Sequence, residues 1–316
     1  MVAIRDGIRT WWASPAARAT VFALLGGLVF HGLLLFGQLN SRDDAFVEHD
    51  FRLWAATAAL SSVLWIAALG RGIRTVRALP ASWRRGRSWW KASIAAYAVL
   101  VLTAGMMLDR IAQGTSFQVP IRHFPAVVNV FIVFGAVAAA PWALSIWLAQ
   151  EKTGRAAREM LPDDEADPSA VAGAVSGVLT VWRVIERSAL ALSLTVSTSV
   201  LTTGALRLAL IGSGAVEPDG FPPYFVLGYG ALIAALLVAV LLPLVLAWRA
   251  WAVSLVERTL PPPDSGLLDE ELIASRARME EQLHLDARFV RNPIALLSVL
   301  SPFATAVITT LIPSGG

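Results

Sequence analysis

Long uncharged runs alternate with short charged loops along this 316-residue chain. A helix of about 20 apolar residues spans the ~30 Å hydrocarbon core of a bilayer. The predicted spans are 19–38, 53–70, 92–108, 125–150, 188–206, 224–248 and 293–316. Pro302 interrupts the last of these, so a re-entrant segment is the alternative there. The pattern predicts an all-α polytopic membrane protein with six to seven transmembrane helices.

Similar features recur in the predicted hairpins. A Leu-Pro pair ends each of them, in VRALP at 76–80, REMLP at 158–162 and ERTLP at 257–261. These matches favour two or three repeated hairpins plus a C-terminal span, although apolar helices also match by chance. The predicted divisions are 1–80 (an interfacial N-terminal helix and the first hairpin), 81–162 (the second hairpin), 163–261 (an interfacial helix and the third hairpin) and 262–316 (a cytoplasmic amphipathic helix and a seventh span).

Charge predicts the orientation. The loop 71–91 carries seven arginine and lysine residues and no acid, which is typical of a cytoplasmic loop. The segments 39–52, 109–123 and 212–223 are then outside. We expect a multi-pass protein of the cell membrane with a cytoplasmic N-terminus and an extracytoplasmic C-terminus. Several tryptophans fall at the predicted inner boundary and are expected to anchor it in the interface; among them are Trp142, Trp182, Trp248 and Trp251.

Composition narrows the chemistry. Hydrophobic residues make up 56% of the chain and charged ones 16%, against about 25% charged in soluble domains. Cysteine is absent, which excludes disulfides and thiolate sites. No two of the four histidines have metal-ligand helical spacing, and hydrolase elbows, Walker loops and dinucleotide glycine patterns are missing. We therefore expect no enzyme activity, cofactor, metal site or nucleic-acid partner, and solvated acidic loops at 43–50 and 163–167.

The predicted fifth span is unusual because it is rich in hydroxyl groups, which lipid does not require. These are Ser188, Ser193, Thr195, Ser197, Thr198, Ser199, Thr202 and Thr203. One interpretation is that they bond to carbonyls of their own helix or of neighbouring helices, so that helices pack closely. The other is that this helix lines a polar path through the membrane.

Polar residues at a similar depth in other spans complete the candidate path. The candidates are Ser193, Ser197, Thr203, Arg207, Arg110, Asp109, Asn129 and His31. Ionisable groups in a membrane are costly unless they are paired or face water, which favours a functional role. The alternative is that Arg110 and Arg207 extend to the headgroups while Asp109 pairs with one of them. A positive charge at the outer mouth, from Arg207, would favour anionic solutes.

These observations predict a membrane channel or transporter with a polar path beside the fifth span, favouring anionic solutes. The alternative is a non-catalytic membrane subunit that docks a protein partner through the predicted helix 265–291, whose apolar side carries Leu268, Leu272, Met279 and Leu283. A homo-oligomer or a membrane complex is compatible with either function. Gly173 and Gly177 have the GxxxG spacing that lets helices approach, a spacing that also arises by chance in alanine-rich helices.

Overall fold

The structure is a computed structural model. It describes residues 14–83, 94–99, 101–103, 105–106, 119–159, 168–261, 270–285, 303–305 and 307. Their helices are α2 (Pro15–Asn40), α3 (Asp44–Glu48), α4 (Phe51–Ala78), η1 (Ala81–Trp83), α6 (Phe124–Glu159), α7 (Pro168–Gly212), η2 (Pro218–Gly220), α8 (Pro223–Thr259) and α9 (Glu270–Gln282). Within these described ranges the regular secondary structure is entirely helical, which confirms the all-α prediction.

Five helices of the described part are long and apolar enough to cross a membrane. They are Pro15–Asn40, Phe51–Ala78, Phe124–Ala156, Ser169–Gly212 and Pro218–Thr259. The chain is therefore a helical membrane protein. Within the third predicted span, 92–108, a shorter apolar helix, Ile94–Thr103, is found, and the described residues 105–106 are also helical. The seventh, at 293–316, lies outside the described residues apart from 303–305 and 307, so the count of six to seven and the repeated hairpins stay predictions.

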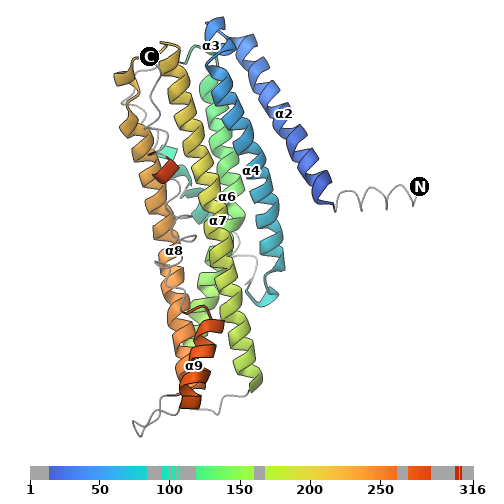
Figure 1. The fold of residues 1–316 in the computed structure, drawn as a ribbon, viewed down its shortest axis with the longest axis vertical. Coiled ribbons are helices and arrows are strands. Elements are labelled where there is room, and N and C mark those ends of the chain that lie inside the picture. Colours follow the sequence, from blue (N-terminus) through green and yellow to red (C-terminus); the bar gives the residue numbers. More distant parts are fainter. Residues whose placement is uncertain are drawn as a thin grey trace, which may run out of the picture.

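Helix α7 is the central element of the bundle. It packs against α4, α6 and α8, and α6 also packs against α4 and α8, whereas α2 leans away from the others (Figure 1). In the most apolar window of α7, 56% of the residues are buried, against 6% for α2. The outer leucines of α2, such as Leu28 and Leu39, are consequently exposed and suited to lipid.

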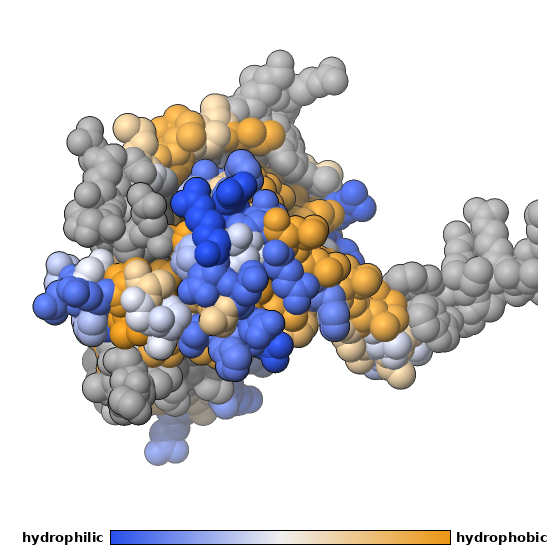
Figure 2. Space-filling model, turned by 90° about the horizontal axis from the view of Figure 1, so that it is seen from above, coloured by the Kyte–Doolittle hydropathy of each residue, from blue (hydrophilic) through white to orange (hydrophobic). Residues whose placement is uncertain are grey.

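The segments 41–50, 119–123 and 213–222 gather at one end of the bundle, called here the loop end. Ser41 forms a bridge with Ile121, and the backbone N–H of Arg42 donates to the carbonyl of Pro120 at 2.9 Å. Asp43 caps α3, so the acidic segment is a short helix rather than an open loop. Viewed from this end, hydrophilic residues gather over the middle of the bundle with hydrophobic ones beside them (Figure 2). The predicted outer loops therefore share one end.

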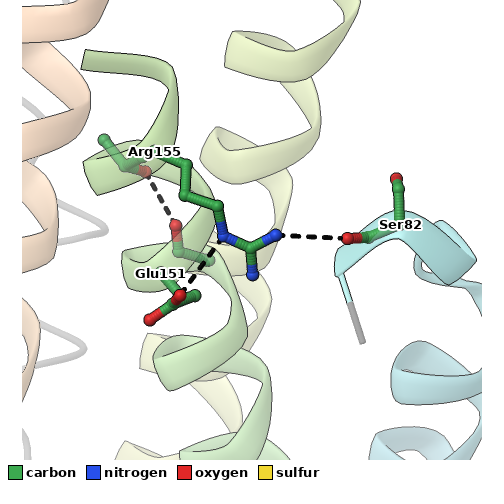
Figure 3. Close-up of polar contacts among 5 residues, drawn as sticks. Ser82, Glu151 and Arg155 are labelled. Atoms are coloured by element: carbon green, nitrogen blue, oxygen red, sulfur yellow. Dashed lines mark hydrogen bonds and ion pairs between the residues drawn. The ribbon is translucent and has the colours of Figure 1, made fainter. Parts of the chain in front are cut away.

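Helices α7 and α8 are longer than a bilayer requires. Their 45 and 37 residues give lengths of about 68 and 55 Å, against a hydrocarbon core of ~30 Å. Both helices extend past α4 at the opposite end of the bundle, called here the α9 end (Figure 1). Residues 169–186, predicted as an interfacial helix that runs into the fifth span, are the first part of α7. Near this end Arg155 of α6 pairs with Glu151 at 3.2 Å and donates to the Ser82 carbonyl, which fastens η1 to α6 (Figure 3).

Four of the tryptophans expected at the inner interface are instead buried between helices. Exposed fractions are 1% for Trp142, 4% for Trp182, 2% for Trp248 and 4% for Trp251. The Trp142 indole N–H donates to the Ala68 carbonyl of α4, and that of Trp248 donates to the Val178 carbonyl of α7. The interpretation as interface anchors was wrong for these four, because α6, α7 and α8 pack against one another here and these rings fill the space between them.

Candidate functional site

A cavity of about 250 Å³ lies beside α7, in the half of the bundle nearer the loop end. Its polar wall consists of four hydroxyl residues of α7: Thr195, Ser199, Thr202 and Thr203. Five aromatic residues from α4, α6, α8 and the described part of 94–106 also line it, beside aliphatic residues and glycines; the aromatic ones are Trp54, Trp65, Phe131, Tyr229 and Tyr97. The site is thus a largely apolar cavity that contains five aromatic rings and has hydroxyls concentrated on one side.

Helical periodicity explains why these four hydroxyls share one wall. Positions 195, 199, 202 and 203 follow the spacing i, i+4, i+7 and i+8, which places residues on one helix face. Ser193 and Ser197 lie about 120° and 160° away from Ser199 at ~100° per residue. They belong to other faces of α7 and are not among the described residues that line the cavity.

Each hydroxyl of the wall donates to a carbonyl one turn earlier in α7. Thr195 donates to Ala191 at 2.9 Å, and Ser199 donates to Thr195 at 3.1 Å. Thr202 donates to Thr198 at 2.8 Å, and Thr203 donates to Ser199 at 3.0 Å. This is the back-bonding that the first interpretation of the fifth span expected. The bonds use the hydroxyl protons and leave oxygen lone pairs available.

Hydroxyls also join α7 to α4. The Ser61 hydroxyl lies 2.9 Å from that of Thr202. The indole N–H of Trp65 donates to the Thr198 hydroxyl at 2.9 Å and to the Thr195 carbonyl at 3.2 Å. These contacts are buried, so polar interhelical bonds stabilise the wall of the cavity.

The predicted path residues are not brought together as a set. Thr203 lines the cavity. Arg207 lies one turn nearer the loop end, 5% exposed, and its Nε donates to the Phe221 carbonyl at 2.7 Å. His31 is exposed on α2 with Nδ1 2.8 Å from the Gly27 carbonyl oxygen, and Asn129 is exposed on α6.

The two fifth-span serines differ in their surroundings. Ser193 is 2% exposed, and its hydroxyl finds no hydrogen-bond partner within the described part of the chain, whereas Ser197 is half-buried. Asp109 and Arg110 lie outside the described residues. Of the eight candidates, Thr203 and its neighbour Arg207 are the two that the described structure places at or next to the cavity.

Sequence reasoning missed most of the cavity lining. Thr195, Ser199 and Thr202 were recognisable, because their helical spacing marks one face of the hydroxyl-rich span. The aromatic members carried no comparable signal, since aromatic residues occur throughout apolar helices. Their convergence depends on how α4, α6 and α8 pack around α7.

The predicted docking helix is in part used within the protein. Leu283, directly after α9, is fully buried, and Met279 packs against the same core as Trp182 and Trp248. The His284 ring stacks on Trp182 with centroids 5.8 Å apart. The apolar side of this helix therefore faces its own bundle at Met279 and Leu283.

No protein-family model, curated protein or solved structure matched this chain. Its function is therefore argued from the geometry of the cavity.

Proposed function

We propose that this protein is a membrane transporter that binds a small solute in the cavity beside α7. The observation that carries the proposal is the cavity of about 250 Å³ with hydroxyls on one wall, enclosed by helices that are long enough to cross a membrane. Ligand sites in membrane helix bundles lie between helices and combine apolar walls with a few polar groups.

The packing at the α9 side of the cavity favours a transporter over an open channel. Beyond Thr195 in that direction lies a buried apolar cluster that includes Trp142, Ile146, Leu192 and Leu244. Within the described part of the chain, this apolar packing favours a cavity that is closed toward the α9 end. A solute bound in the cavity would reach the α9 end after these helices rearrange, as in alternating access.

Arg207 gives little support for a preference for anions. Its Nε is engaged by the Phe221 carbonyl, its side chain is buried, and it is not among the described lining residues. The hydroxyl wall itself carries no formal charge. The proposal is therefore transport of a small solute without an anion filter at Arg207.

Cysteine accessibility tests the proposal, because the chain contains no native cysteine. Ser199→Cys and Thr203→Cys should react with a small hydrophilic thiol reagent in sealed vesicles. Ser193→Cys is the matched control, since it is buried on another face of the same helix. For a transporter, a membrane-impermeant reagent should reach Thr203→Cys from each side of the membrane. Equal protection of all three positions would contradict the proposal.

A further inference from the structure

Most of the hydroxyl and indole groups that line the cavity already donate hydrogen bonds within the protein. The four α7 hydroxyls donate to carbonyls of their own helix. The Tyr97 hydroxyl donates to the Ala136 carbonyl at 2.7 Å, and the Trp65 indole donates to α7. The cavity therefore offers oxygen lone pairs and few free donors.

A wall of this kind distinguishes ligands that donate a hydrogen bond from ligands that can only accept one. A ligand that can only accept, such as a carboxylate, finds few free donors and must break a back-bond of α7 to gain more. A ligand with an N–H or O–H group can donate to a hydroxyl oxygen without disturbing α7. None of the described lining residues is charged, so a charged ligand would lose its hydration without gaining a counter-charge.

The size and the walls of the cavity indicate a ring-shaped ligand. A cavity of about 150 Å³ is large enough for benzene, and this one has about 250 Å³, which suits a molecule of two fused rings. The rings of Trp54 and Trp65 lie 5.9 and 6.0 Å from Phe131, at interplanar angles of 57° and 68°. Rings set at such angles give a further ring both face and edge contacts.

From these three features we infer that the cavity binds an uncharged aromatic molecule of one or two rings, which donates an N–H or O–H hydrogen bond to the hydroxyl oxygens of α7. The inference rests on the proposed function, because it assigns the substrate class of the same site. Aromatic contacts hold the ring, and the donated bond orients it.

Indole and 1-methylindole are the test pair, because they have the same ring system and differ in the N–H donor. Binding of radiolabelled indole to the purified protein is measured by equilibrium dialysis, with the second compound as competitor. We expect 1-methylindole to bind about five- to tenfold more weakly, the effect of one hydrogen bond. Indole-3-acetate, which is anionic, should bind more weakly still. Equal affinity of indole and 1-methylindole, or tighter binding of the anion, would overturn the inference.

A pair of glycine variants locates the binding. Gly105 lines the cavity, and a Cβ added there meets no atom within 4 Å, so Gly105→Leu should fill the space without a clash. Gly32→Leu is the matched control, since Gly32 has the same freedom on the exposed side of α2. Bound indole should be lost in Gly105→Leu and kept in Gly32→Leu. Because both variants are measured in the same detergent, the difference between them excludes indole that partitions into the micelle. Loss in neither variant would place the binding elsewhere and overturn the inference.

Labelling of Thr203→Cys separates this inference from the proposed function. Indole should slow the reaction, while 1-methylindole at the same concentration should slow it less. A reactive Thr203→Cys that indole does not protect would refute the ligand class and leave the transport proposal intact. An unreactive Thr203→Cys, alongside indole binding that Gly105→Leu abolishes, would refute the transport proposal and keep the ligand class.

Discussion

Gly173 and Gly177 allow a sharp test of how closely α7 and α8 approach. A Cβ added at Gly177 would lie 2.7 Å from Cη2 of Trp251 and 3.3 Å from its Cζ2. One added at Gly173, one turn earlier, would meet nothing within 4 Å. Only one glycine of the GxxxG pair is therefore required by packing. Replacing each by alanine should therefore affect the stability of the protein differently.

Two free-energy terms determine how the two alanine substitutions change the stability of the protein. Alanine is favoured over glycine within a helix by about 1 kcal/mol, and this gain applies equally at both positions. At Gly177 the new methyl group must displace the ring of Trp251, which is 4% exposed and belongs to the buried core. Overpacking of this kind typically costs about 1–3 kcal/mol. We expect Gly173→Ala to stabilise the protein and Gly177→Ala to be less stable than it by about 1–3 kcal/mol.

Reversible unfolding in mixed micelles, followed by circular dichroism, measures this difference. The shared helix-propensity term cancels in the comparison between the two variants. Adding Trp251→Leu, which removes the ring, should erase most of the difference between them. Equal stability of Gly173→Ala and Gly177→Ala would refute the close approach of α8 to α7 at this position.

Three further predictions concern the bundle. A double-mutant cycle of Trp65→Phe and Thr198→Val should give a coupling of about 0.6 kcal/mol, and at most ~1.7, in unfolding experiments, because the two side chains share a buried interhelical bond. Arg207→Met should lower stability by about 1–3 kcal/mol, since the Phe221 carbonyl loses a charged donor, and should leave the balance of anion and cation flux unchanged. Cysteines at Ser82 and Ala215, both exposed and at opposite ends of the bundle, should label from opposite sides of sealed vesicles; labelling from one side would overturn the predicted topology.

The sequence predicted five of the spans well, because the length and hydropathy of a spanning segment are set by the bilayer. The predicted segment 53–70 lies inside α4, and 188–206 lies inside α7. Helix ends were not predictable in this way, since charged residues beyond the hydrocarbon remain helical. In α4 the helix continues to Ala78 through Arg71, Arg74 and Arg77. At the α9 end the extended parts of α7 and α8 pack against each other. The tryptophans of this region are therefore buried.

The candidate site was predictable only in its helical part. A hydroxyl-rich face at Thr195, Ser199 and Thr202 follows from counting residues along one helix. The partner of Arg207 does not, because the Phe221 carbonyl belongs to a loop whose path depends on η2 and on the burial of the Phe221 ring. The prediction had grouped Arg207 with His31 and Asn129 because all three lie at a similar depth in their spans. His31 and Asn129 lie on other helices and are exposed.

The two interpretations of the fifth span are compatible, since they concern different atoms of the same groups. A back-bond uses the hydroxyl proton, and a ligand that donates uses the lone pairs. Whether a hydroxyl acts in packing or in binding therefore depends on the space beside it. The hydroxyl oxygen of Thr198 accepts a hydrogen bond from the Trp65 indole of α4, whereas Thr203 borders the cavity. Loss of the Thr198 hydroxyl should therefore affect the stability of the α4–α7 contact, and loss of the Thr203 hydroxyl should affect what the cavity holds.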